Sequence, residues 1–234
     1  PSCVVLVATV RALKYNGGAA RADLARESLA ALERGIANLR AHIENMQGYG
    51  LPVVVALNRF ATDTEAELDF IRSYCAELGV PVALTEVFAK GGAGGEELAR
   101  LVCGAAQQPN AFRHLYDLDC SIEEKLRAIA TKIYRAGGVR FTAAARKSLE
   151  RIEALGYGGL PVCVAKTQYS LSDDPALLGC PEGFTVTVRD LYVSAGAGFV
   201  VALTGDIMTM PGLPREPAAC RMDIDDQGVI TGLF

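Results

Sequence analysis

Two phenylalanines follow predicted strands at positions where an aromatic ring could bind a flat ligand. Phe60 stands in the loop 58–64 after the apolar run 53–57, and Phe88 follows the apolar run 80–84. Short apolar runs rich in β-branched residues predict strands covered on both faces, and α/β sheets bind ligands at the carboxyl ends of such strands. Two rings at adjacent strand ends could hold a heterocycle between them, because aromatic faces stack. The alternative is that both rings belong to the hydrophobic core.

Cationic and hydroxyl side chains also follow predicted strands. Lys166 and Ser170 come after the strand predicted over 162–165, and Arg11 comes after the strand predicted over 4–10. Ammonium, guanidinium and hydroxyl groups are good donors to phosphate and carboxylate oxygens. We therefore expect these three residues to bind a nucleotide or another anion. The alternative for Lys166 is a surface lysine that binds no ligand.

The elements that must position these side chains alternate between strands and helices. Apolar periodicity and capping signals predict helices over residues 19–47, 65–78, 96–106, 121–134 and 142–155. Further strands are predicted over 184–192 and 199–203, and residues 219–234 resemble a closing hairpin. This order predicts an α/β fold with a mostly parallel sheet, helices on both faces, right-handed crossovers and a C-terminal β-rich portion. The stretch 11–18 is expected to be a loop, and Gly35 is a possible break in its helix.

Composition and charge exclude several classes of function. The chain has 234 residues and a net charge of −4, without a basic stripe, which argues against a nucleic-acid partner. Apolar runs are too short to span a bilayer, and without a basic segment before an apolar one we expect no signal peptide. The seven cysteines form no CxxC pair, so we expect reduced thiols, no metal site and a cytoplasmic protein. His42, on a predicted helix, is expected to be a packed or exposed histidine rather than a catalytic one.

Several long motifs give the chain a specific resemblance. They are VATVRALKYNGG at 7–18, PVVVALNRFATDTEAE at 52–67, TEVFAKGGAGGEEL at 85–98, LPVCVAKTQYSLSDDP at 160–175, TVTVRDLYVSAGAGFVVALTGDIMTMPGLP at 185–214 and ITGLF at 230–234. In this order they resemble the C-terminal part of formate–tetrahydrofolate ligases. The sequence departs from the family at Ala61, where proline is usual, and at Phe88, where tryptophan is frequent.

The resemblance implies a reaction and a substrate site. Members of the family use ATP with Mg²⁺ to make formyl phosphate, which N10 of tetrahydrofolate then attacks to give 10-formyltetrahydrofolate. The same resemblance implies that Phe60 and Phe88 hold the pterin. It implies that the folate cleft is completed by Leu84, Ala61, Pro211, Gly212 and Leu213. It also implies a homotetramer of the full-length protein, with small molecules as its substrates.

The resemblance also implies that two parts of the chain have different roles. Residues 1–108 would form the folate-side domain, and residues 109–234 would complete the sheet of a P-loop NTPase-related nucleotide domain. Because the chain enters a predicted strand at Val4 and contains no GxxxxGK[ST] sequence, we expect a fragment whose catalytic residues lie upstream. Such a fragment is expected to lack ligase activity on its own.

Two other interpretations remain open at this stage. One is a non-catalytic folate-binding or oligomerisation module. The other is a degenerate GTPase-like domain, because Asn58-Arg59-Phe60-Ala61 is similar to the guanine-reading NKxD motif. That motif needs an aspartate to accept hydrogen bonds from guanine, and Ala61 has no acceptor in its side chain.

Overall fold

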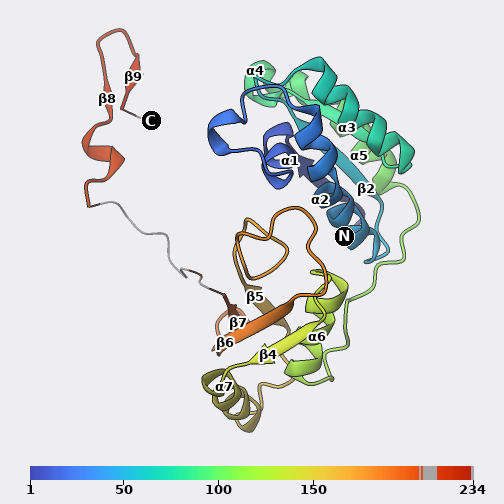
Figure 1. Ribbon diagram of the computed structural model, residues 1–234, viewed down its shortest axis with the longest axis vertical. Helices are drawn as coiled ribbons and strands as arrows, with labels where there is room; N and C mark the ends of the chain where they lie inside the picture. Colours follow the sequence, from blue (N-terminus) through green and yellow to red (C-terminus); the bar gives the residue numbers. More distant parts are fainter. Residues whose placement is uncertain (206, 208–214, 233–234) are drawn as a thin grey trace.

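The computed structural model describes residues 1–205, 207 and 215–232, and its strands form two larger sheets and a short hairpin (Figure 1). The first sheet is parallel, with the order β1-β2-β3. Its strands are β1 (Val4–Ala8), β2 (Val53–Asn58) and β3 (Val82–Thr85). Because the three strands are parallel, their carboxyl ends lie at one edge of the sheet, and a helix follows each of them.

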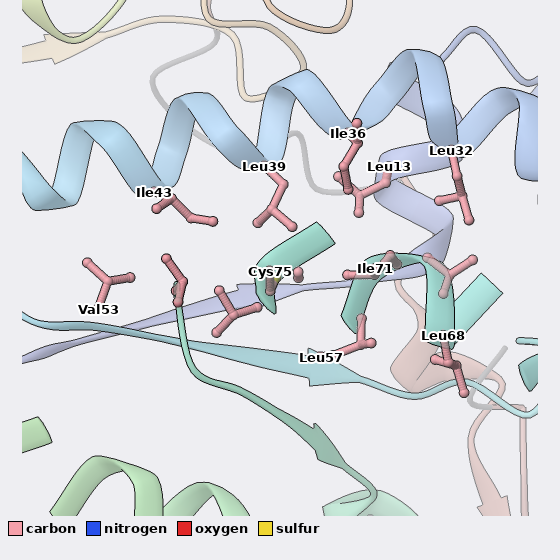
Figure 2. Packing of buried hydrophobic residues seen from close by; sticks show 14 residues of the cluster. Leu13, Leu32, Ile36, Leu39, Ile43, Val53, Leu57, Leu68, Ile71 and Cys75 are labelled. Atoms are coloured by element: carbon pink, nitrogen blue, oxygen red, sulfur yellow. The ribbon is translucent and has the colours of Figure 1, made fainter. Parts of the chain in front are cut away.

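Helices cover both faces of this first sheet. They are α1 (Val10–Asn16), α2 (Leu29–Gln47), α3 (Glu65–Glu77), α4 (Val87–Lys90) and α5 (Glu96–Ala106), with short 3₁₀ helices η1 (Arg21–Asp23) and η2 (Gly91–Gly95). Figure 2 shows Leu39 and Ile43 of α2 directed toward Val53 and Leu57 of β2, with α3 packed beside them. Alternate residues of β2 face the other way, where α5 contacts β2 and β3.

The second sheet is mixed, with the order β4-β6-β7-β5. Its strands are β4 (Gly138–Phe141), β5 (Val162–Ala165), β6 (Thr185–Ser194) and β7 (Phe199–Thr204). Helices α6 (Ile122–Lys132) and α7 (Ala143–Ala154) share one hydrophobic cluster with β6 and β7. A short 3₁₀ helix η3 (Ala218–Cys220) precedes the exposed antiparallel strands β8 (Asp223–Ile224) and β9 (Ile230–Thr231).

The α/β class and the mostly parallel pairing are confirmed. The pairs β1–β2, β2–β3, β4–β6 and β5–β7 are parallel, whereas β6 and β7 pair antiparallel. The residues 195–198 between β6 and β7 suffice for a hairpin, whereas a parallel pair needs a crossover of a dozen or more residues. The strand β4 was missed, because its sequence GVRF is too short to show an alternating pattern and its first glycine was taken as the end of a helix.

Two expectations about helices were also wrong. The predicted loop 11–18 contains α1, which begins after Thr9, whose hydroxyl accepts a hydrogen bond from the Ala12 amide at 3.1 Å. The helix predicted from residue 19 begins at Leu29, after the N-cap Ser28, and it continues through Gly35 without a break. In contrast, the helices predicted from residues 65 and 121 are confirmed, and each begins with a capping box, Thr64 with Glu67 and Ser121 with Glu124.

Hydrogen bonds join α2 to residues of the second half of the chain. Asn38 donates to the Gly179 carbonyl at 2.7 Å, and Asn45 donates to the Ile133 carbonyl at 2.9 Å. Arg135 pairs with Glu44 at 2.6 Å. The Gly179 amide in turn donates to Asn16 Oδ1 at 3.1 Å, so the loop that follows β5 lies beside α1 and α2. Among the described residues, none of the helices is both long enough and apolar enough to cross a membrane.

Candidate functional site

Phe60 and Phe88 lie at the same edge of the first sheet. Strands β2 and β3 are parallel neighbours, with Asn58 opposite Thr85, and the Arg59 amide donates to the Thr85 carbonyl at 3.0 Å. Phe60 therefore follows the end of β2 by two residues, and Phe88 follows the end of β3 by three, on α4. Phe60 is 39 % exposed and Phe88 is fully exposed. Both rings are accessible to a ligand at this edge.

Asp63 holds the turn that carries Phe60. The Asp63 amide donates to the Phe60 carbonyl at 3.0 Å, and the Phe60 amide donates to Asp63 Oδ2 at 2.8 Å. Only 6 % of Asp63 is exposed, and its Oδ1 is buried without a hydrogen-bond partner in the described structure. Burial raises the pKa of Asp63, while the Phe60 amide opposes the shift. The reciprocal bonds fix the backbone of the turn and so the direction from which the Phe60 ring projects.

Arg11 is brought to Phe60 from a different strand end. Its guanidinium lies 5.4 Å from the centroid of the Phe60 ring, within the range of a cation–π contact. Arg11 belongs to α1, which follows β1 at the same edge of the sheet. The structure thus places a residue expected to bind anions against a residue expected to bind the pterin, a contact that the sequence reasoning did not anticipate.

Ion pairs link the segments that carry the two phenylalanines. Arg59 lies between Glu65, at 2.7 Å, and Glu86, at 3.7 Å. Glu86 also pairs with Lys90 of α4, and this hydrogen bond lowers the pKa of its carboxyl group. These pairs connect the loop after β2 to the loop after β3.

The other residues expected in the folate cleft have mixed placements. Leu84 is half-buried and packs against the core of the first sheet, one residue before the end of β3. Ala61 is exposed in the turn after Phe60. Pro211, Gly212 and Leu213 lie outside the residues that the structure describes.

Lys166 and Ser170 lie together in the loop after β5. The Lys166 ammonium donates to the carbonyls of Thr167 at 2.9 Å, Ser172 at 3.3 Å and Ser170, and it lies 5.1 Å from the centroid of the Tyr134 ring. Burial lowers the pKa of Lys166 to about 8. The Ser170 hydroxyl donates to the Leu177 carbonyl. The polar groups of both side chains are directed to the loop itself, and their role in binding an anion stays a prediction.

Comparison with models of known protein families adds an independent finding. The model described as formate–tetrahydrofolate ligase matches residues 1–234. The match covers the whole sequence, and therefore both larger sheets and every residue of the candidate site.

Proposed function

The chain belongs to the formate–tetrahydrofolate ligase family, and from this premise we propose that it supplies the folate side of an ATP-dependent ligase. In the proposed reaction, ATP phosphorylates formate to formyl phosphate. N10 of tetrahydrofolate then attacks the formyl carbon, a C–N bond forms, the C–O bond to phosphate breaks, and inorganic phosphate leaves. The N10 proton is lost to solvent, and the product is 10-formyltetrahydrofolate.

The position of Phe60 and Phe88 is the observation that supports this assignment best. They follow neighbouring parallel strands at one edge of the sheet, which is where α/β folds bind ligands. The pterin would lie against the Phe60 ring, with Phe88 as the second aromatic face. Leu84, Ala61 and the segment 211–213 would complete the cleft.

Phosphoryl transfer requires groups that bind the phosphates of ATP, and the sequence of this chain has no recognisable motif that supplies them. The 234 residues contain no GxxxxGK[ST] sequence, whose backbone amides and lysine would surround the phosphates of ATP. In the described part of the chain, no group of three or more His, Cys, Asp or Glu side chains could hold a metal ion. We therefore assign the main binding site for ATP and Mg²⁺ to other residues of the ligase. Arg11, Lys166 and Ser170 stay proposed as additional contacts to an anion.

The proposed division of the chain follows from this assignment. Residues 1–108 would bind the folate, and residues 109–234 would complete the sheet of the nucleotide domain. The chain by itself is then expected to bind tetrahydrofolate without ligating it. Formation of 10-formyltetrahydrofolate by the purified chain with formate, ATP and Mg²⁺ would contradict this expectation.

Binding of tetrahydrofolate can be measured by isothermal titration calorimetry. Phe60→Ala and Phe88→Ala are each expected to weaken binding by about fivefold or more, because a lost aromatic stacking contact costs about 1 kcal/mol or more. Phe112→Ala is the matched control, because Phe112 has the same exposed fraction as Phe60, 39 %, and stacks on Tyr49 away from this edge. Equal affinities of the parent chain and a Phe60→Ala, Phe88→Ala double variant would refute the proposed pterin site.

A further inference from the structure

Arg135 has a backbone conformation that a residue with a side chain rarely adopts. Its φ is 61°, and in the described part of the chain it is the only residue other than glycine with a positive φ. In this left-handed region Cβ comes close to the following carbonyl oxygen, so glycine is the usual residue in such a turn beyond a helix, here α6. A strained backbone persists where the surrounding structure imposes it, and it is frequent at clamps and switches.

Hydrogen bonds on both sides of Arg135 impose this conformation. The Gly183 amide donates to the Arg135 carbonyl at 2.9 Å, and the Gly137 amide donates to the Phe184 carbonyl at 2.8 Å. All four groups belong to the backbone, so a glycine at position 135 could form the same bonds without the steric cost. The presence of an arginine is therefore explained by the contacts of its side chain.

The guanidinium of Arg135 reaches from the second half of the chain to α2 in the first half. It lies 2.6 Å from Oε2 of Glu44 and 3.4 Å from Oδ1 of Asn45. Only 19 % of the Arg135 side chain is exposed. The hydrogen bonds from Arg40 and Arg135 lower the pKa of the Glu44 carboxyl group, against the effect of burial. Hydrogen bonds between charged groups are about twice as strong as those between neutral groups, so this pair is a strong link between the two halves.

The ion pair stands beside the hydrogen bonds that hold the loop after β5. Gly179 of this loop accepts from the Asn38 amide at 2.7 Å, and its own amide donates to Asn16 Oδ1 at 3.1 Å. Asn38 and Asn45 are two helical turns apart on α2, so they lie on the same face of that helix. The face of α2 that holds the loop is thus the face that Arg135 contacts.

We propose that Arg135 is a latch between the two halves of the chain. While its guanidinium pairs with Glu44, the loop after β5 lies against α1 and α2. When the pair separates, the hydrogen bonds of Gly179 break with it, and the second half moves away about the connection 107–121. Because Arg11 lies on α1 and Lys166 lies after β5, the latch determines whether the elements that carry these two proposed anion contacts are held together. The latch operates whichever ligand the chain binds.

Amide hydrogen exchange measured by NMR tests the latch. The Gly179 amide reports the contact between the halves, and the Val55 amide, which donates to the Pro81 carbonyl inside the first sheet, is the internal reference. In Arg135→Gly and in Glu44→Gln, exchange at Gly179 should rise by about fivefold or more relative to Val55, since a hydrogen bond between charged groups is lost. The double variant should not exceed the larger single effect, because both changes break one interaction. Added salt should accelerate exchange at Gly179 more in the parent chain than in Glu44→Gln.

Arg40→Gln is the matched control, because Arg40 pairs with the same Glu44 carboxylate at 2.7 Å but from within α2. It should leave exchange at Gly179 unchanged. Arg135→Lys keeps the positive charge at this position, and exchange at Gly179 should stay slower in it than in Arg135→Gly.

Three results would overturn the latch. The first is unchanged exchange at Gly179 in both Arg135→Gly and Glu44→Gln. The second is equal acceleration at Gly179 and Val55, which would show a loss of overall stability rather than separation of the halves. The third is the same acceleration in Arg40→Gln, which would show that any loss of charge pairing at Glu44 loosens α2.

Discussion

The ammonium of Lys14 lies 2.8 Å from Oε1 of Glu67, and both side chains are completely buried. Lys14 also donates to the Arg26 carbonyl, and Glu67 accepts hydrogen bonds from the amides of Ser28, at 3.0 Å, and Thr64, at 3.2 Å. One buried ion pair thereby joins α1, the start of α2 and the start of α3. Because α1 carries Arg11 and the loop before α3 carries Phe60, the pair holds the two strand ends of the proposed site in register.

Glu67→Gln should destabilise the fold strongly. It leaves the Lys14 ammonium buried without a counterion, and the removal of one partner from a buried pair costs about 3–5 kcal/mol. Glu96→Gln is the control, because Glu96 forms an exposed pair with Arg100. The free energy of unfolding, measured with urea at pH 7, should fall far more for Glu67→Gln than for Glu96→Gln. Similar losses in the two variants would contradict a structural role for the buried pair.

The same pair should make stability sensitive to acid. Burial raises the pKa of Glu67, but the bonds from Lys14, Ser28 and Thr64 outweigh burial, so its pKa lies below the ordinary value of 4.5. A carboxyl group with a lowered pKa in the folded state stabilises the fold above its unfolded pKa, and this contribution is lost as the pH falls through the folded pKa. The difference in unfolding free energy between parent and Glu67→Gln should therefore shrink below about pH 4.5.

Asp63→Asn should show the opposite dependence on pH. The raised pKa of Asp63 means that the folded state binds a proton more readily than the unfolded state. Ionisation of this buried group costs free energy, so the parent chain loses this contribution to stability as the pH rises from the unfolded pKa through the folded one. The free energy of unfolding of Asp63→Asn, relative to that of the parent chain, should be higher at pH 7 than at pH 4. An energy difference that is independent of pH would show that folding does not raise the pKa of Asp63.

Local signals explain which parts of the fold were predictable. The starts of the helices α3 and α6 and the strand 162–165 were predictable because each depends on residues close in sequence. The helix α1 was missed because its burial depends on packing against α2, which the stretch 11–18 does not reveal. Antiparallel pairing of β6 with β7 depends on the short connection between two strands that had been recognised individually.

The site was predictable only in outline. The positions of Phe60 and Phe88 follow from their predicted strand ends, because the ends of parallel strands meet at one edge. The Lys14–Glu67 pair joins residues 53 positions apart, and its existence depends on the tertiary structure. Arg21 and Tyr169 meet for the same reason, since they come from different halves of the chain. Periodicity describes one element at a time and carries no information on such contacts.

Gly35→Ala should destabilise the contact between α1 and α2. A Cβ on Gly35 would lie 1.9 Å from the Leu13 carbonyl oxygen, so the two helices would have to separate. Overpacking of this kind costs about 1–3 kcal/mol or more. Gly104→Ala is the matched control in another helix, because a Cβ there meets no atom within 4 Å. It should stabilise the chain by about 0.5–1 kcal/mol, since alanine is the better helix former. Equal effects of the two substitutions on the free energy of unfolding would contradict the close approach of Gly35 to Leu13.

His42 should make the contact between the two halves of the chain sensitive to pH. It lines a cavity of about 220 Å³ with Tyr134 and Lys166, between α2 and the loop after β5. Burial lowers the pKa of His42, and the charges of Lys166 and Arg135 lower it further, so its folded pKa lies below 6.5. The folded state then binds fewer protons than the unfolded state, and stability falls as the pH decreases from 6.5 through the folded pKa.

His42→Gln should therefore lose less stability than the parent chain between pH 7.5 and pH 5.5, as measured by urea unfolding. His114→Gln, which removes the second of the two histidines of the chain, should retain the pH dependence of the parent. The folded pKa of His42 can be read directly from the imidazole proton signals in an NMR titration of the His114→Gln variant. A folded pKa at or above 6.5 would show that the imidazolium is accommodated beside Lys166 and Arg135, and would refute the proposed origin of the pH dependence.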